Sequence, residues 1–191
     1  FGVWYGDIKN LTFENITING LEGVKLEPGK KHSESAYFAG SVGYFSGNLE
    51  NVHAKNVFIK GANSFLKTQN VGGLVGYTNP SKAFVFKKCS VTNITIQAKG
   101  TQIGGMVGSL NKNHTLTECT ANYVSLRVNG SSTTNIAGLV GDIADATGVK
   151  FEKCKVSNIE FLKYDGTKNS DYAPTHPLYG SSREGTPTIE D

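Results

Sequence analysis

The chain has 191 residues, 38% of them hydrophobic, and a formal net charge of +3. This size and content suit one elongated core, and they are too small for two ordinary domains joined by a linker. The lysines are spread through turns such as Lys30-Lys31 and Lys87-Lys88. The sequence therefore lacks the basic stripe with interleaved aromatic residues that is typical of nucleic-acid binding. No segment approaches the apolar length of a membrane span.

The first residue already lies inside a repeated motif. A six-residue, glycine-rich segment recurs at Val71–Gly76, Ile103–Gly108 and Ile136–Gly141, with a looser copy starting at Phe38 and a decayed copy at Phe1. The later copies start at residues 38, 71, 103 and 136, so they are 33, 32 and 33 residues apart. Such a period indicates a repeat architecture. Because Phe1 falls inside a copy and no signal peptide is present, we expect a mature or excised region of an exported chain.

A second segment follows each glycine-rich copy and shows the strand period of two. Its apolar positions alternate up to an asparagine and then resume one residue out of phase, as at Ile94 and Ile96 after Asn93. A one-residue slip turns a strand onto its other face, so we expect the chain to bend at the asparagine. Asparagine tolerates the left-handed conformation that such a corner needs. The predicted corners are Asn15, Asn56, Asn93 and Asn158, and Tyr123 interrupts the series.

Stacking these repeats in register gives a right-handed parallel β-helix of about five repeats over residues 1–163. Each repeat contributes the glycine-rich strand, a strand with an inward Cys or Val, and the strand that follows the corner. A ladder of asparagine amides would satisfy polar groups buried at the corner. The predicted inward columns are Leu11, Val52, Cys89, Cys119 and Cys154, and Ile16, Val57, Ile94, Val124 and Ile159.

Residues 164–191 leave the repeat pattern and are rich in Gly, Ser, Thr and Pro. Two interpretations stay open for this segment. It could be a linker or disordered tail, or it could cap the exposed end of the β-helix. In a cap, the residues available to cover the end are Tyr172, Leu178 and Tyr179.

The alternation within the glycine-rich strand predicts which face points inward. The more uniform column is expected inside, and it consists of Val42, Val75, Val107, Val140 and Tyr5. The other face then presents the small residues Ala39, Gly72, Gly104 and Ala137 beside the exposed Trp4, Leu74, Met106 and Leu139. Either the polar insertions between repeats fold back over this strip, or the strip docks a protein or glycan, because exposed apolar patches mark interaction sites. Those insertions are residues 19–36, 61–70, 98–102 and 129–135.

Candidate residues for chemistry are few. The three cysteines share one inward column, so we expect them to be buried, reduced and stacked as small hydrophobic residues. They lack the close spacing and the fourth ligand of a zinc site, and we expect no metal and no cofactor. The histidines, among them His53 and His114, resemble surface residues, and no hydrolase or phosphate-loop motif is present. Asp142 and Asp145 follow a glycine-rich strand and could form a small carboxylate pair.

The repeated G-G-φ-V-G strand with its asparagine-corner strand resembles the GLUG motif, well over residues 38–162 and weakly over 1–37. That motif occurs in repeat regions of bacterial surface and secreted proteins, including adhesin-like proteins and non-catalytic parts of immunoglobulin-A-cleaving proteases. The resemblance implies an extracellular or cell-surface scaffold, joined to flanking domains of a larger chain, that binds a host or cell-surface protein or glycan. We therefore expect a non-catalytic adhesion or interaction module. The alternative is a polysaccharide lyase-like or hydrolase-like β-helix enzyme with its site near Asp142 and Asp145.

Overall fold

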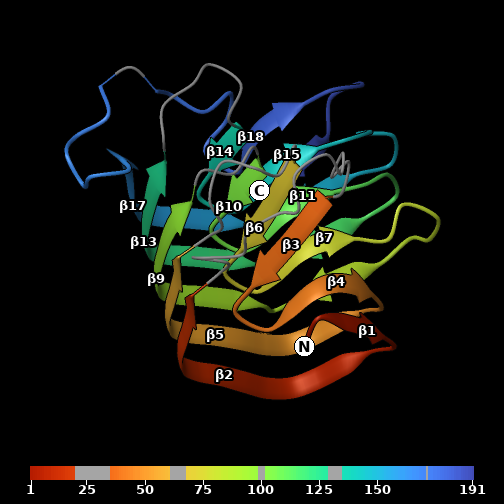
Figure 1. Cartoon of the computed structure of the whole chain (residues 1–191). Helices are drawn as coiled ribbons and strands as arrows, with labels where there is room; N and C mark the ends of the chain where they lie inside the picture. Colours follow the sequence, from red (N-terminus) through yellow and green to blue (C-terminus); the bar gives the residue numbers. More distant parts are fainter. Residues whose placement is uncertain (20–34, 61–67, 99–101, 129–134, 171) are drawn as a thin grey trace, which may run out of the picture.

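The computed structural model describes residues 1–19, 35–60, 68–98, 102–128, 135–170 and 172–191 (Figure 1). Within these ranges the chain forms strands and no helix. All the named strands that pair do so in parallel, and they form three sheets. The predicted all-β class with parallel strands is therefore confirmed. The predicted insertions lie largely outside the described residues.

Sheets A and C consist of short strands. The strands of sheet C end in the first half of a glycine-rich segment, and strands of sheet A begin in its second half. The strands of sheet A, in spatial order, are β1 (Val3–Tyr5), β4 (Val42–Ser46), β7 (Val75–Thr78), β11 (Val107–Leu110), β15 (Val140–Ile143) and β18 (Tyr179–Ser182). Those of sheet C are β3 (Ser35–Ala39), β6 (Thr68–Gly72), β10 (Gln102–Gly104) and β14 (Asn135–Ala137).

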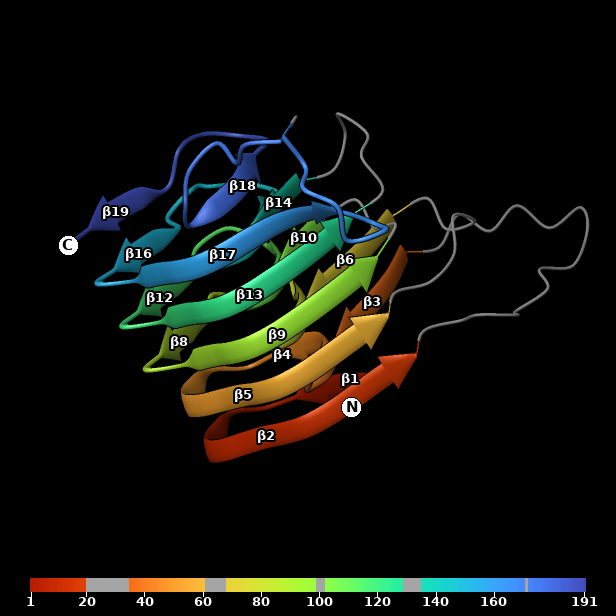
Figure 2. The same ribbon diagram turned by 90° about the vertical axis from the view of Figure 1, so that its left-hand side faces the viewer.

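Sheet B is the largest sheet, and its long strands lie side by side in Figure 2. The long strands are β2 (Ile8–Asn19), β5 (Leu49–Lys60), β9 (Ser90–Ala98), β13 (Thr120–Val128) and β17 (Lys155–Lys163). Its short strands are β8 (Val85–Lys87), β12 (Thr115–Thr117), β16 (Lys150–Glu152) and β19 (Thr188–Glu190). The two chain termini lie toward opposite ends of the stack of strands (Figure 2).

Successive repeats pair in constant register. In sheet B, Ala121 lies beside Val91 of the preceding repeat and Val156 of the following one, as the sequence alignment predicts. Sheets A and C follow the same rule. Equivalent residues therefore form columns, with neighbouring strands about 4.8 Å apart.

The predicted corner positions adopt the left-handed conformation. Their φ angles are 58° at Asn15, 53° at Asn56, 57° at Asn93, 53° at Tyr123 and 52° at Asn158. The amide of Asn93 donates to Asn56 Oδ1 at 2.8 Å, and the amide of Asn56 donates to Asn15 Oδ1 at 3.0 Å. At the last corner Asn158 donates to Asn122, because Tyr123 has no amide to offer. The prediction of a buried corner is wrong, since these side chains are exposed on the convex side of the bend.

A second column of left-handed residues lies five positions before the first one. It consists of Asn10, Asn51, Lys88, Glu118 and Lys153, with φ between 52° and 55°. Each marks a bend between a short and a long segment of sheet B, as between β8 and β9 at Lys88. The bend brings both Phe86 and Cys89, three residues apart, into the core. Every repeat from β2 to β17 therefore has two such corners.

The inward columns are buried in the middle of the stack and partly exposed at its ends. Val52, Cys89 and Cys119 are buried, whereas Leu11 in the first repeat is 41% exposed and Cys154 in the last is intermediate. Ile16 and Ile159 are likewise only partly buried. The expectation of complete burial is wrong at these ends, because an end repeat has a neighbour on one side only.

The C-terminal segment continues the sheets. Tyr179 pairs with Val140 in sheet A, and Ile189 pairs with Phe151 in sheet B. Pro177-Leu178-Tyr179-Gly180 thus corresponds in position to the glycine-rich motif, although its sequence departs too far from the other copies to be predicted as one. The Tyr172 hydroxyl donates to Ile136 O at 2.6 Å and accepts from Ile136 N at 2.9 Å, so it occupies the free edge of β14. Residues of the predicted tail therefore cover the last repeat.

We predict that Asn93→Ala lowers the free energy of unfolding by about 1–2 kcal/mol, because alanine is strained in the left-handed region. The lost side-chain hydrogen bond from Asn93 to Asn56 adds little to this destabilisation, because it is exposed to water. Urea denaturation of the variant, with Lys82→Ala at an exposed turn position as control, measures the difference. The control is expected to stay within about 0.5 kcal/mol of the wild type. Equal denaturation midpoints for the two variants would contradict a left-handed corner at Asn93.

Candidate functional site

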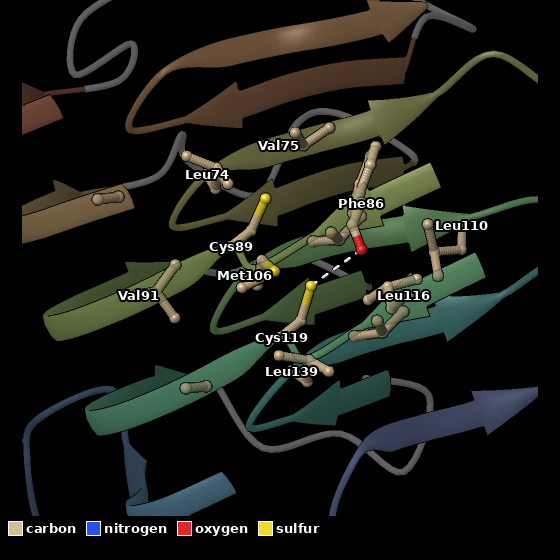
Figure 3. Packing of buried hydrophobic residues seen from close by; sticks show 14 of the residues in the cluster. Leu74, Val75, Phe86, Cys89, Val91, Met106, Leu110, Leu116, Cys119 and Leu139 are labelled. Carbon is tan, nitrogen blue, oxygen red and sulfur yellow. Dashed lines mark hydrogen bonds between the residues drawn. The ribbon is translucent and has the colours of Figure 1, made fainter. Parts of the chain in front are cut away.

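The predicted interaction strip is buried. Leu74, Met106 and Leu139 have no exposed surface, and Figure 3 shows them beside Cys89 and Cys119 in the core. The glycine-rich segment is not one straight strand: β6 ends at Gly72 and β7 begins at Val75. Leu74 and Val75 therefore both reach the core, and the prediction that Leu74, Met106 and Leu139 are exposed is wrong.

The small residues of the strip face another sheet of the same chain. A Cβ atom on Gly72 would lie 2.8 Å from Gly108 N, and one on Gly108 would lie 2.5 Å from Val71 N. On Gly104, a Cβ atom would lie 1.9 Å from Val107 O and 2.6 Å from Gly141 N. Sheets A and C thus approach backbone to backbone and leave no room for a Cβ atom at Gly72 and Gly104, whereas the equivalent positions of the outer copies carry Ala39 and Ala137. The strip predicted from Gly72 and Gly104 is therefore covered by other strands of the same chain.

The N-terminal copy has a different register from the one predicted. Trp4 pairs with Phe45, and Tyr5 pairs with Ser46. Trp4 is partly buried and packs against Phe1 at a ring-centroid distance of 4.9 Å. Tyr5, which was expected in the inward column, is 72% exposed. The decayed copy is therefore shifted by four residues, with Gly2 at the position of Gly43.

Asp142 is fully buried in an ion pair that joins β15 to the C-terminal segment. Arg183 Nη2 donates to Asp142 Oδ2 at 2.7 Å, and Arg183 Nε donates to Oδ1 at 3.3 Å. The remaining donors are Ser181 Oγ at 2.7 Å, Asn135 Nδ2 at 3.1 Å and Ser109 Oγ at 3.4 Å. Asp145 instead accepts a hydrogen bond from Thr147 N in a local turn. Asp142 thus binds side chains of neighbouring strands and of the C-terminal segment, whereas Asp145 is engaged within its own turn.

The cysteines form a column of free thiols. Cys119 Sγ donates to Phe86 O at 3.2 Å, as Figure 3 shows, and Cys154 Sγ donates to Leu116 O at 3.2 Å. Hydrogen bonds with the thiols of Cys154 and Cys89, together with burial, raise the pKa of Cys119 well above its ordinary value. In the described part of the chain, no group of three or more His, Cys, Asp or Glu residues could hold a metal ion.

We predict that a thiol reagent such as dithionitrobenzoate modifies Cys154 in the native protein well before Cys119. Cys154 is partly exposed at the end of the stack, whereas Cys119 is buried and its raised pKa keeps it protonated. The thiolate is the reactive form, so the difference should persist at alkaline pH. Mass spectrometry of tryptic peptides after timed labelling assigns the order. Labelling of Cys119 as fast as Cys154 would contradict the column.

Two histidines, His114 and His53, make polar contacts within the fold. His114 is buried, against the expectation of a surface residue, and its Nδ1 lies 2.7 Å from Lys112 O. Burial lowers the pKa of His114, which favours the neutral imidazole. His53, on the outer face of sheet B, lies 2.7 Å from Ser90 Oγ and 2.9 Å from Asn51 Oδ1. The contact with Ser90 bridges adjacent repeats, as the asparagine ladder does, whereas Asn51 lies in the same strand as His53.

A cluster of four tyrosines, here the tyrosine patch, lies where sheets A and C meet. It contains Tyr5, Tyr37, Tyr44 and Tyr77, from β1, β3, β4 and β7. Tyr37 stacks on Tyr77 with ring centroids 4.9 Å apart and lies 5.9 Å from Tyr44. Figure 1 shows β3 lying beside β4 and β7, which explains how residues of two sheets meet. Tyr37, Tyr44 and Tyr77 are partly exposed.

The sequence contains a signal for this patch that the glycine-rich repeat alone does not reveal. Tyrosine follows the V-G pair in two consecutive copies, at Tyr44 and Tyr77, and the register places the two side by side. Burial raises the pKa of Tyr44, and the neighbouring Tyr5, Tyr77 and Tyr37 add to the increase. The Tyr44 hydroxyl therefore stays protonated and uncharged at neutral pH.

Comparison of the chain with protein-family models, curated proteins and solved structures found no match. No helix in the described ranges has the length and hydropathy needed to cross a membrane. Function is therefore inferred from the geometry of the chain itself.

Proposed function

We propose that the chain is a right-handed parallel β-helix that works as a non-catalytic interaction module outside the cell. Each repeat adds strands to the same three sheets in constant register, which is the pairing expected of successive coils. The right-handed sense follows from the strong preference of crossover connections between parallel strands, about 98% of which are right-handed.

The tyrosine patch is the observation that carries the interaction role. Tyrosine offers a large, rigid contact surface with a polar tip and loses little conformational entropy on binding. Here the rings stand on paired strands of sheets A and C, which hold them in place. The resemblance to GLUG repeat regions supports a place at the bacterial surface, with flanking domains that anchor or present the module. Its partner would be a host or cell-surface protein or glycan.

The carboxylates support a scaffold more than an enzyme. Asp142 is saturated by Arg183, Ser181, Asn135 and Ser109, so its oxygens are engaged in holding the C-terminal segment. Asp145 is engaged in its own turn. A general acid and base for glycoside cleavage would need two carboxyl groups converging on one substrate bond.

Binding and turnover assays on one protein sample test this proposal. Fluorescent protein is applied to arrays of glycans and extracellular-matrix proteins, and we expect saturable binding that weakens in Tyr44→Leu and Tyr77→Leu. The same sample is incubated with neutral and anionic polysaccharides, and no new reducing ends or unsaturated products are expected. Product release that disappears in Asp145→Asn would favour the enzyme, and absence of binding to every array would contradict the interaction role.

A further inference from the structure

The last two cysteines of the inward column stand beside each other on adjacent repeats. Lys155 pairs with Thr120 in sheet B, and Lys155 N donates to Cys119 O at 3.0 Å. Cys119 and Cys154 therefore precede paired residues of neighbouring strands, whose backbones lie about 4.8 Å apart. A separation of that size falls within the range of about 4.4–6.8 Å between Cα atoms that a disulfide bridges. The two thiols are also hydrogen-bonded to each other.

The three thiols of the column differ in their access to solvent. Cys89 and Cys119 are buried, whereas Cys154 is partly exposed. Among the described strands, β17 pairs with β13 alone, so the repeat that carries Cys154 has an open side. The Cys154 side chain therefore has room to rotate toward the dihedral angle near 90° that a disulfide requires. A small oxidant that enters from solvent meets Cys154 first.

The hydrogen bonds of the column favour the thiolate at its exposed end. The hydrogen bond with Cys119 lowers the pKa of Cys154, although burial opposes this effect. The pKa of Cys119 is raised by its two thiol neighbours and by burial. The thiolate is the nucleophilic form, and cysteines that react with oxidants are typically accessible, low in pKa and close to a second cysteine. Cys154 therefore suits the attacking thiol, and Cys119 suits the thiol that resolves the product.

We propose that a hydroperoxide oxidises Cys154 and that Cys119 then closes a disulfide between the repeats of β13 and β17. In the first step the Cys154 thiolate attacks the terminal oxygen of ROOH. The O–O bond breaks, the alkoxide leaves and takes up a proton as ROH, and Cys154 becomes a sulfenic acid. In the second step the Cys119 sulfur attacks the Cys154 sulfur, the S–O bond breaks, and the hydroxyl group leaves with the Cys119 proton as water.

The two steps balance. Two thiols lose two electrons and two protons in forming one disulfide, and the hydroperoxide is reduced to an alcohol and water. The product would fasten the last long strand of sheet B covalently to the strand before it. This inference does not depend on the proposed interaction role.

Treatment of the purified, fully reduced chain with a few equivalents of hydrogen peroxide tests the proposal. Remaining thiols are blocked with N-ethylmaleimide, and tryptic peptides are compared by mass spectrometry before and after reduction. We expect the peptides of residues 113–127 and 154–155 to be linked, and Cys89 to remain a free thiol. Dithiothreitol should restore all three thiols.

Two variants separate the roles of the cysteines. In Cys119→Ala the sulfenic acid at Cys154 has no resolving thiol, so we expect dimedone to add to Cys154 during peroxide treatment. Cys89→Ala is the matched control and should form the same linked peptides as the wild type. Circular dichroism confirms that each variant is folded, and the linkage in the wild type decides the assignment even where a variant does not fold.

The proposal fails if the linked peptides join Cys89 to Cys119, because the reaction would then lie deeper in the column. It fails equally if Cys154 is oxidised to sulfinic acid without any linked peptide, since Cys119 would not resolve the sulfenic acid. Recovery of three free thiols after peroxide treatment would show that Cys154 is not reactive.

Discussion

Replacing Gly104 by alanine is expected to lower the free energy of unfolding by about 3 kcal/mol or more. The new methyl group would lie 1.9 Å from Val107 O, 2.6 Å from Gly141 N and 2.8 Å from Leu139 O. All three atoms belong to the backbone of neighbouring strands, so no side chain can move aside to make room. Ala137 occupies the paired position in the next repeat, but in the middle of the stack sheets A and C would have to move apart locally, and part of the hydrophobic contact beneath them would be lost.

Gly2→Ala is the matched control for this change. A Cβ atom on Gly2 meets nothing within 4 Å, so we expect a change within about 0.5 kcal/mol. Urea denaturation followed by circular dichroism compares both variants with the wild type. Midpoints that coincide for Gly104→Ala and Gly2→Ala would show that the two sheets are not in backbone contact.

The second large effect is expected at Arg183, whose replacement by alanine should cost about 3 kcal/mol. Removing one partner of a buried ion pair leaves an uncompensated charge, and such losses run to about 3–5 kcal/mol. We expect the lower end, because the Arg183 side chain is 52% exposed whereas that of Asp142 is 0% exposed. The Ser181, Asn135 and Ser109 donors remain and soften the loss.

Asp145→Ala provides the comparison for the ion pair. Its carboxylate is exposed and hydrogen-bonds with Thr147 of its own turn, so we expect a loss below about 1 kcal/mol. Thermal and urea denaturation of Arg183→Ala and Asp145→Ala at neutral pH measures the loss of stability of each variant. If Arg183→Ala is as stable as Asp145→Ala, the ion pair does not fasten the C-terminal segment to β15.

The repeat period and the one-residue shifts in the alternation of apolar residues predict much of the backbone structure. The slip after Asn93 correctly indicated a left-handed corner, because only a bend can keep Val91 and Ile94 both inside. The same slip between Phe86 and Cys89 marks the second corner, but Lys88 is not a residue that signals a left-handed conformation. The second corner can therefore be predicted from the hydrophobic spacing but not from the identity of the residue at position 88.

The exposed surface was harder to predict than the core. Reading Val71–Gly76 as one straight strand forced Leu74 and Val75 onto opposite faces, whereas the break between β6 and β7 turns both toward the core. The contact between Gly72 and Gly108 joins residues that are distant in the sequence, and no local pattern reports such a contact. The tyrosine patch likewise depends on β3 lying beside β7.

The distance between Thr17 and Glu160 tests most directly whether the repeats stack in parallel register. These residues occupy one column through Phe58, Thr95 and Ser125, four strand spacings apart in sheet B. Spin labels at Thr17→Cys and Glu160→Cys, with the three native cysteines replaced by alanine, are measured by double electron–electron resonance. The stacked repeats predict a single narrow distribution with the backbones about 19 Å apart. A distribution centred at about twice that separation, or one without a peak, would contradict the stacking on which the tyrosine patch depends.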